Sequence, residues 1–496
     1  MNAPVAYDVS RLFLAPLSRT PRGIDRVDMA YAEHVFKTNE NSVAVLPTAW
    51  GVRCFTRERA LAGLFRLRQL WAENILPEAD PVWLALRARL LDASGESGTT
   101  SVDPAPQRAS KGASKSAPLR FLSLLAATGL TTGRSVRSGV PRQAVFISVG
   151  QIGLAFPFLL RWLNARKDVT PVFMLHDVIP IGTPEYVEPQ GVRGHTNMVA
   201  ATAGFAHGLI VTTRAARDAV EFELAAQGRT PLPTFTRALP PSRQFGPHVE
   251  ADPALATCRY FVACATLEPR KNLELLGEIW KRLVAEQGAA APHLIIVGAR
   301  GFTGHGIAAR LQRAPSTTKR LHIVHGLSTP ALARLIAGAR ALLSPSFIEG
   351  FGLPLVEAQA LGTPVIASDI PSHREIGGEG TVLIDPLDGP GWKAAIEHAA
   401  HIEPSRREAG FLPDWPDYFS AFESWMDQAA AHGWRQSEAE FELADGSNVN
   451  GSAVARLPTN DEAQTELILA GAEHGFTLSS ESSSSERPSF PAQNRG

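Results

Sequence analysis

Short runs of apolar residues alternate with helix-like stretches along most of the chain. In the first half, the runs cover residues 7–10, 42–46, 145–149, 171–175 and 208–212. In the second half, they cover residues 261–264, 294–297, 322–324, 341–343, 364–367 and 381–384. Short buried strands that alternate with helices are typical of doubly wound parallel sheets. We therefore predict an α/β protein with two such sheets, each forming a Rossmann-like domain.

A Pro-rich break over residues 238–253 separates the two sets of runs. We place an N-terminal, acceptor-side domain at residues 1–245 and a second domain at residues 246–403. The 496 residues are enough for two domains of this size. Ligands of doubly wound sheets bind at the carboxyl ends of the strands. The loops that follow strands should therefore line a cleft between the two domains.

Two segments lose this alternation. Residues 93–118 are small, polar and interrupted by Pro and Gly, and residues 436–496 end in SSESSSSERPSFPAQNRG. Such compositions bury too little apolar surface to fold, so we predict a disordered insertion and a mostly disordered tail. Residues 404–435 differ, because WPDYFSAFESWMDQAA places its large apolar residues on one side of a helix. We predict that this helix packs back on the domains through Trp415, Phe419, Phe422, Trp425 and Met426.

The amino-acid composition argues against several classes of protein. Lys plus Arg number 48 and Asp plus Glu number 49, which lacks the basic excess of a nucleic-acid binder. The three cysteines are far apart and predict neither a disulfide framework nor a zinc site. No apolar run reaches the roughly 18–20 residues of a membrane-spanning helix, since the stretch 119–130 is too short. These features favour a cytoplasmic enzyme and leave peripheral contact with the inner face of a membrane open.

The segment ALLSPSFIEGFGLPLVEAQALGTPVIASD, residues 341–369, carries the main candidate site. It predicts a strand, a loop rich in small residues and a helix that begins near Leu353. Gly350 and Gly352 would let a ligand approach the backbone, and the start of a helix attracts an anion such as a diphosphate. Glu357, expected in the first helical turn, and Glu349 could accept hydrogen bonds from sugar hydroxyls. The alternative is that Glu357 only complements the helix dipole and Glu349 is a solvated loop acid.

A second candidate segment is CATLEPRKNLELL, residues 264–276. It follows a strand and opens a helix, so Arg270 and Lys271 would lie at a strand-to-helix turn. Two cations at that position could neutralise a diphosphate. The alternative is a basic pair on a solvated face, which is the usual environment of such a pair.

Together these motifs resemble a known family. EGFGLPLVEA has the form of the E-x7-E motif of retaining GT-B glycosyltransferases, and TLEPRKN resembles the phosphate-binding segment of the mannosyltransferase-like members of family 4 (group 1). IVGARG, HGL and GTPVIAS follow in the order that the family shows. The resemblance covers residues 258–390 well and the N-terminal half thinly, through YDVSRL, RGIDRV and LHDVIP. It implies the GT-B fold, with two Rossmann-like domains facing a central cleft.

The resemblance also implies roles for the donor. Glu349 would hold hydroxyls of the donor sugar, and Glu357 would bind the ribose. Arg270 and Lys271 would bind the diphosphate and stabilise its charge as it leaves. The other donor-binding positions that it implies are Gly23, Gly326, Leu327, Gly350, Phe351, Gly352 and Leu353.

Three of these positions have a specific part. Gly326 and Leu327 would meet the base, and Gly23 would let the donor phosphate and the acceptor approach each other. His176, at the end of a strand, would face the transferred sugar. Its alternative is a structural pair with Asp177. The catalytic set implied by the resemblance is His176, Arg270, Lys271 and Glu349.

One departure concerns the phosphate-binding segment. Many members carry Gly-Arg where this chain has Ala265-Thr266, so the phosphate clamp would rest on Arg270 and Lys271.

The predicted function is transfer of a hexose, with mannose the best guess, from a GDP-sugar or UDP-sugar with retention of configuration. The acceptor would be a polysaccharide or a lipid-linked oligosaccharide, and no metal or other cofactor is expected. Two alternatives of other classes stay open. One is a non-catalytic scaffold of the same fold, and the other is a sugar-nucleotide epimerase. A phosphorylase is less favoured, because no lysine stands out as a pyridoxal site.

Overall fold

The structure is a computed structural model. It describes residues 3–14, 21–48, 50–71, 75–92, 101–102, 133–299, 301, 304–312, 319–378, 380–402 and 413–434. All of these lie in one compact unit, Met1–Glu438. The predicted disordered insertion lies outside the described residues except at 101–102. The apolar stretch 119–130 and the predicted tail 436–496 lie wholly outside them.

The first half of the chain forms an eight-stranded sheet in the order β5-β3-β2-β1-β6-β7-β8-β9. The strands are β1 Val5–Asp8, β2 Val43–Thr48, β3 Gly51–Thr56, β5 Arg134–Ser135, β6 Val145–Ser148, β7 Thr170–Met174, β8 Gly208–Val211 and β9 Thr234–Thr236. The pairs from β2 to β9 are parallel, whereas β3 is antiparallel to β2 and to β5. The antiparallel edge was not predicted.

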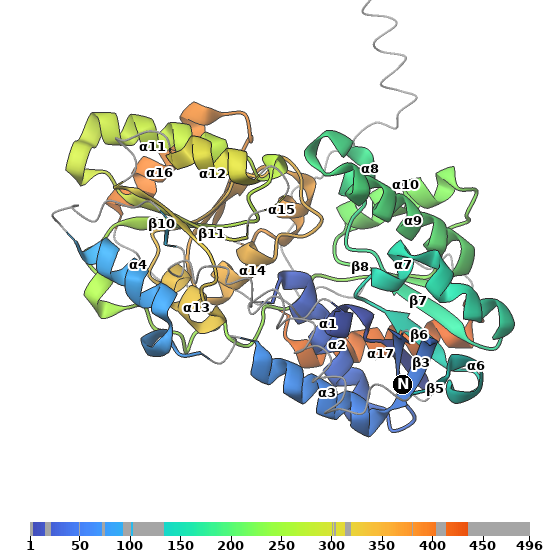
Figure 1. Cartoon of the computed structure of the whole chain (residues 1–496). Helices are drawn as coiled ribbons and strands as arrows, with labels where there is room; N and C mark the ends of the chain where they lie inside the picture. The colour runs from blue at the N-terminus through green and yellow to red at the C-terminus, as the bar shows by residue number, and fades with distance from the viewer. Residues whose placement is uncertain are drawn as a thin grey trace, which may run out of the picture. The chain divides into compact units, whose positions relative to one another are not determined.

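Helices connect these strands (Figure 1). They are α1 Ser10–Leu14, α2 Gly23–Thr38, α3 Arg57–Leu70, α6 Val136–Gly139, α7 Ile152–Ala155, α8 Ile179–Gly182, α9 Pro189–Phe205 and α10 Arg214–Ala226. Short 3-10 segments, η3 Pro157–Ala165 and η4 Pro184–Tyr186, lie between α7 and β7 and after α8.

The second half forms a seven-stranded sheet in the order β15-β14-β13-β10-β11-β12-β4, with all recorded pairs parallel. The strands are β10 Tyr260–Cys264, β11 His293–Val297, β12 Leu321–Val324, β13 Leu342–Ser344, β14 Val365–Ser368, β15 Thr381–Ile384 and β4 Ser101–Val102. The helices are α11 Leu273–Gln287, α12 Gly304–Gln312, α13 Thr329–Ala337, α14 Leu353–Ala360, α15 Pro371–Ile376 and α16 Gly389–His401. The prediction of two doubly wound α/β sheets is confirmed.

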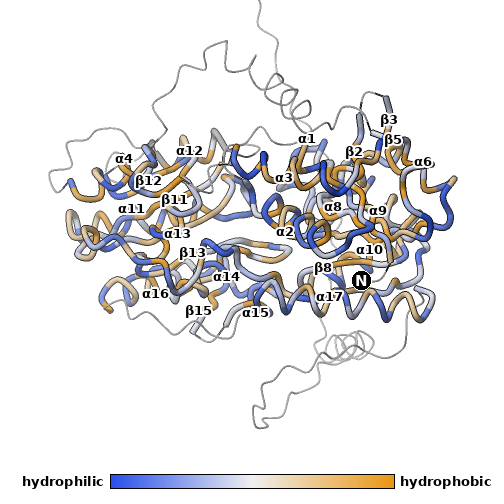
Figure 2. Tube along the Cα trace, turned by 90° about the horizontal axis from the view of Figure 1, so that it is seen from below, coloured by the Kyte–Doolittle hydropathy of each residue, from blue (hydrophilic) through white to orange (hydrophobic). Residues whose placement is uncertain are grey.

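The helices cover the sheets with one face only. Along the helices in Figure 2 hydrophobic and hydrophilic positions alternate, as this arrangement requires. In α11, for example, Leu276, Trp280 and Leu283 are buried against the second sheet. This pattern leaves the loops at the strand ends free to form a site.

Residues 77–92 pack against the second sheet, although they precede most strands of the first sheet in the sequence. Here η2 Pro77–Ala79 leads into α4 Pro81–Leu91, and Figure 1 shows α4 beside β10 and β11. Val82, Trp83, Leu86 and Leu90 share one helical face and pack in the core of the second sheet. Asp80 caps α4 and also accepts a hydrogen bond of 2.7 Å from the backbone N–H of Ser328. The division of the chain at residue 245 did not anticipate this crossing.

The helix α17, Trp415–Ala431, packs against the first sheet. Tyr418, Phe419, Phe422, Trp425 and Met426 are buried there, and Trp415 is partly buried. The hydroxyl groups of Tyr418 and of Tyr31 on α2 lie 2.6 Å apart. The predicted packing of this helix is confirmed. No described helix is long and apolar enough to cross a membrane.

A buried pair of histidines lies at the start of β11 and β12. Arg320 donates to Nε2 of His293, so the proton of that ring resides on Nδ1, which lies 2.9 Å from Nε2 of His322. Burial lowers the pKa of His322 to about 4, with help from the charges of Arg89 and Arg320. Burial also lowers the pKa of His293, to about 3. Both rings are therefore neutral near pH 7.

This pair should make the protein lose stability as the pH falls from about 6.5 to about 4. In that window the unfolded chain binds protons at histidines with pKa values near 6.5, whereas the folded chain does not. The free energy of unfolding should fall by roughly 2 kcal/mol for His322 alone at pH 5. Urea unfolding at pH 7.5 and pH 5.0 measures the difference. His322→Gln should show a smaller drop than the wild type, and an equal drop would contradict the assignment.

Candidate donor site

The loop between β13 and α14 has the shape that its glycines predict. Gly352, with φ of +109°, precedes α14, and Pro354 lies in the first turn. Gly362, with φ of +70°, follows the end of the helix. In the described part of the chain, the N–H groups of Phe351, Gly352 and Leu353 donate to no acceptor. They are free to bind an anion together with the helix dipole.

Glu357 lies elsewhere than predicted. It is the fifth residue of α14, beyond the first turn, and its side chain is 2% exposed. It forms an ion pair of 2.7 Å with Arg26 of α2. Burial raises the pKa of Glu357, and the charge of Arg26 opposes that rise. The carboxylate therefore faces α2. The prediction that Glu357 complements the helix dipole from the first turn is wrong.

Arg270, Lys271 and Glu349 form one cluster. Arg270 and Lys271 lie in the 3-10 turn η6 Pro269–Lys271, which follows β10. Lys271 forms an ion pair with one oxygen of Glu349, and Arg270 lies 3.1 Å from the other. The hydroxyl of Ser346 donates to the same carboxylate at 2.7 Å. The basic pair is thus directed at the loop, contrary to the solvated alternative.

The cluster is largely withdrawn from water. The side chains of Glu349, Lys271 and Arg270 are 10%, 14% and 19% exposed. Burial raises the pKa of Glu349, but Lys271 and Arg270 outweigh burial and lower that pKa to about 2. Burial lowers the pKa of Lys271, and the charge of Glu349 opposes this. The two cations therefore keep the Glu349 carboxylate ionised despite its burial.

The loop also contacts the first sheet. The hydroxyl of Thr213 donates to the carbonyl oxygen of Gly350 at 3.0 Å. A Cβ added to Gly350 would lie 2.7 Å from the carbonyl oxygen of His176 and 2.7 Å from Cβ of Asp177. Gly350 is therefore required for close contact with the end of β7.

Two further contacts fix the start of α14. A Cβ on Gly23 would lie 3.0 Å from a methyl group of Leu353, so Gly23 contacts the start of the helix rather than open space. Phe351 packs partly buried against the cores of both sheets. The predicted residues of the two halves are thus brought together here.

His176 lies at the end of β7 with a buried Nε2 atom that has no hydrogen-bond partner. Burial lowers its pKa to about 4, with a contribution from the charge of Arg11. The Asp177 carboxylate instead accepts a hydrogen bond of 3.1 Å from the backbone N–H of Ile179. These contacts do not support the alternative of a His176–Asp177 pair. A neutral imidazole here has one nitrogen left for a ligand.

The two residues predicted to bind the base, Gly326 and Leu327, differ in their surroundings. Gly326 has φ of +77°, and open space surrounds the place where its Cβ would be. The side chain of Leu327 is 3% exposed and belongs to the core of the second sheet. Only the backbone of Leu327 is therefore placed to meet a ligand.

Three residues near the loop were not predicted from the sequence. Ser346 holds Glu349, and Arg26 holds Glu357. His373 of α15 is fully buried, binds the carbonyl oxygen of Ser368 through Nδ1, and leaves Nε2 without a partner. That atom lies 3.4 Å from the place of a Cβ on Gly352. Only Arg26 carried a signal, because it belongs to the RGIDRV segment.

The described residues contain no group of three or more His, Cys, Asp and Glu side chains that could hold a metal ion.

The comparison with protein families identifies this part of the chain. Residues 258–401 match the family Glycosyl transferases group 1. This segment is similar to the group 1 glycosyltransferases. The matched glycosyltransferase segment includes Arg270, Lys271, Glu349 and Glu357, and it runs from just before β10 to the end of α16.

Curated relatives of this chain include bacterial mannosyltransferases. The serotype-specific mannosyltransferase WbdA of Escherichia coli is 30% identical over 254 residues, which are 47% of this chain and 30% of WbdA. The O-antigen chain mannosyltransferase B of Escherichia coli is 31% identical over 184 residues, 37% of this chain and 42% of that protein. The chain thus spans less than half the length of these relatives.

A solved structure shares the fold of this chain. Anabaena Alr3699/HepE in complex with UDP and glucose aligns with a TM-score of 0.52 and 12% identity. The alignment covers 86% of this chain and all of that one. The two-sheet GT-B architecture is therefore confirmed.

Proposed function

We propose that this protein transfers a hexose, most simply mannose, from a GDP-sugar or UDP-sugar to a glycan acceptor with retention of configuration. The acceptor is a polysaccharide or a lipid-linked oligosaccharide. The mannosyltransferase names of the relatives favour mannose. The glycosyltransferase family of residues 258–401 favours a nucleotide-sugar donor.

The observation that carries the proposal is the arrangement at the start of α14. Three unused backbone N–H groups of the loop adjoin a buried cluster of two cations and one carboxylate. The N–H groups and the helix dipole favour a diphosphate, and the two cations stabilise the charge that the diphosphate gains as it leaves.

Each side chain then has a defined task. Arg270 and Lys271 exchange part of their contact with Glu349 for contact with the phosphates. Glu349 thereby gains lone pairs for hydroxyl groups of the donor sugar. His176, neutral and with an unused nitrogen, follows β7 with its carbonyl oxygen close to Gly350, and it positions the transferred sugar. The acceptor binds on the side of the first sheet, and catalysis relies on positioning and preorganised charge.

A donor screen tests this function. The purified chain is incubated with GDP-mannose and a panel of other GDP- and UDP-sugars, with short mannose oligosaccharides as acceptors, and release of GDP or UDP is measured. We expect release that depends on the acceptor, fastest with GDP-mannose, and an α-linked product by NMR if configuration is retained. Nucleotide binding without transfer would support the scaffold alternative. Isomerisation of the donor without an acceptor would support the epimerase.

A further inference from the structure

His373 lies beside the start of α14 with one ring nitrogen unused. It belongs to α15, Pro371–Ile376, and its side chain is fully buried. Its Nδ1 lies 2.9 Å from the carbonyl oxygen of Ser368 and donates to it, because a carbonyl oxygen only accepts. In a neutral ring, Nε2 therefore carries the lone pair. Among the described residues, Nε2 has no hydrogen-bond partner, and it has almost no contact with solvent.

The unused nitrogen is directed at the donor loop. A Cβ built on Gly352 would lie 3.4 Å from Nε2 of His373 and 3.3 Å from Cδ2 of the same ring. The N–H of Gly352 is one of the three that are free to bind a diphosphate, with those of Phe351 and Leu353. The imidazole therefore packs against the backbone that is proposed to hold the phosphates.

The turn that leads into α15 contains two more polar atoms without partners. The hydroxyl groups of Ser368 and Ser372 are buried and make no hydrogen bond within the described part of the chain. Buried polar atoms are costly to leave unsatisfied, and they mark a place where a ligand or an ordered water completes the structure. Together with Nε2 of His373, they indicate that this turn is arranged around a polar group that it does not itself supply.

The cations of the donor site are already balanced. Arg270 lies 3.0 Å from Glu268 and 3.1 Å from Glu349, and Lys271 pairs with the other oxygen of Glu349. These two cations thus face two carboxylates. A sugar nucleotide brings a negative charge on each phosphate, and its diphosphate gains a further charge when the sugar leaves. Binding of the donor therefore calls for more positive charge than this cluster displays.

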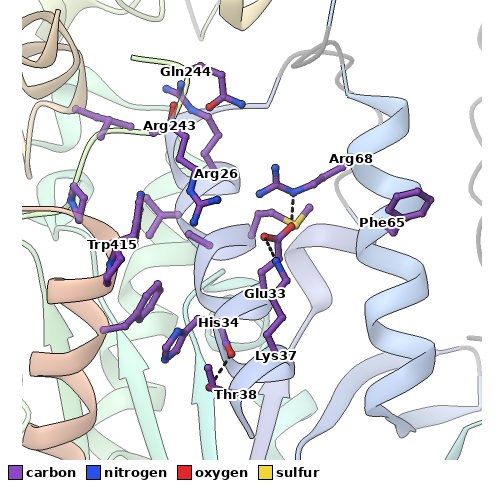
Figure 3. Close-up of a pocket in the computed structure, with 18 residues that line it drawn as sticks. Arg26, Glu33, His34, Lys37, Thr38, Phe65, Arg68, Arg243, Gln244 and Trp415 are labelled. Carbon is purple, nitrogen blue, oxygen red and sulfur yellow. Dashed lines mark hydrogen bonds and ion pairs between the residues drawn. The ribbon is translucent and has the colours of Figure 1, made fainter. Parts of the chain in front are cut away.

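The cations of the neighbouring groove do not supply that charge. The groove lies along α2 and borders the start of α14. Figure 3 shows Lys37 of α2 and Arg68 of α3 on either side of Glu33, with which both form ion pairs. Arg26 of α2 pairs with buried Glu357 at 2.7 Å. These three cations each have a carboxylate of their own.

The groups around His373 leave its ring neutral in the empty site. Burial lowers the pKa of His373, the charge of Glu349 on the donor loop opposes this, and the charge of Lys271 on η6 adds to it. The other charged groups on α14, on α15 and beside them have partners, namely Glu357 with Arg26, Arg374 with Asp369, and Glu375 with the backbone N–H of Arg214. A new negative charge at the start of α14 would reverse the balance at His373.

We propose that His373 is a third cation of the donor site, which takes up a proton from solvent when the diphosphate of a sugar nucleotide binds at the start of α14. The proton adds to the lone pair of Nε2, while Nδ1–H keeps its bond to Ser368. The charged ring then lies beside Gly352 and offsets part of the charge that the diphosphate gains as it leaves. This role rests on the proposed donor site and adds a group that the sequence motifs did not indicate.

Calorimetric titration of the full chain with GDP-mannose, and with UDP-glucose in parallel, tests this role. No acceptor is present, so the heat reports binding. A terminal phosphate titrates near about pH 6, but the esterified phosphates of a sugar nucleotide do not, so a proton taken up on binding goes to the protein. Titrations at pH 6.5 in buffers with different heats of ionisation measure the uptake. We expect roughly half a proton per donor, and affinity that rises about threefold to tenfold from pH 8 to pH 6.

Two variants identify the group that takes up the proton. His373→Asn removes the titrating ring and keeps a side-chain N–H for the carbonyl oxygen of Ser368. Its proton uptake should be close to zero, and its affinity should change less than about twofold over the same pH range. His373→Gln should behave alike, so the result does not depend on the folding of one variant. The matched control is His401→Asn on α16, because His401 also bonds a backbone carbonyl through Nδ1 but is exposed. The control should keep the uptake of the wild type.

The possible outcomes separate this role from the proposed function. Proton uptake that persists in both His373 variants, or that is lost in His176→Asn instead, would overturn the role of His373. Donor binding without any uptake would also overturn it and would leave the donor site standing. Failure of both sugar nucleotides to bind would overturn the donor site, and the role of His373 with it. Proton uptake by His373 without sugar transfer to any acceptor would support its role and contradict only the transferase activity.

Discussion

Lys271→Ala is expected to lower the rate of sugar transfer about 100-fold to 1000-fold. Lys271 supplies a cation that is largely buried beside the free N–H groups at the start of α14. A charge in such a water-poor place stabilises a leaving diphosphate far more than the same charge in water. Release of GDP or UDP, measured at saturating donor, reports the loss.

The control for this variant is Lys281→Ala in α11. Lys281 is 40% exposed and pairs with Glu278, one turn away. Its removal should leave turnover unchanged. Lys271→Arg keeps the charge but changes its position, so we expect an intermediate rate. Wild-type turnover in Lys271→Ala would show that the cluster does not take part in the transfer.

Much of the fold was predictable because its strands are local features. Each run such as Val145–Ser148 or His293–Val297 is short, apolar and flanked by helices, and burial on both sides of the sheet demands that pattern. The strand β3, Gly51–Thr56, which lies next to the edge of the sheet, is less apolar and only partly buried. The placement of α4 with the second sheet depends on contacts with Leu255 and Phe245, more than 150 residues away. No local pattern encodes such a partner.

The donor site was predictable to a similar extent. Gly350, Gly352 and the basic pair can be recognised from the sequence alone, because each is costly or unusual unless it serves a ligand. The partners of the two acids were not visible in this way. Arg26 meets Glu357, and Ser346 meets Glu349, only because the chain folds, and neither pairing has a sequence spacing of its own.

Replacing Glu349 should have two separate effects, one on stability and one on turnover. Glu349→Ala should lower the free energy of unfolding by about 3 kcal/mol, because it leaves two largely buried cations without a counter-charge. Removing Lys271 as well should return about 1–2 kcal/mol, since Arg270 keeps Glu268 at 3.0 Å. Urea unfolding of Glu349→Ala, Lys271→Met and the double variant forms the cycle that measures this coupling. Glu278→Ala, at a 68% exposed side chain, is the control and should change stability by less than about 0.5 kcal/mol.

Turnover in the same variants decides what Glu349 is for. If the carboxylate binds hydroxyl groups of the donor sugar, the double variant regains stability and stays inactive, because neither the sugar ligand nor the phosphate cation returns. Glu349→Gln should lose about 3 kcal/mol of stability and most turnover, since a neutral amide neither balances the two cations nor accepts as many hydrogen bonds as a carboxylate. If turnover instead followed stability across the series, Glu349 would serve only to balance Lys271 and Arg270. The sugar would then need another hydrogen-bond acceptor, and His176 and His373 each have a buried nitrogen without a partner.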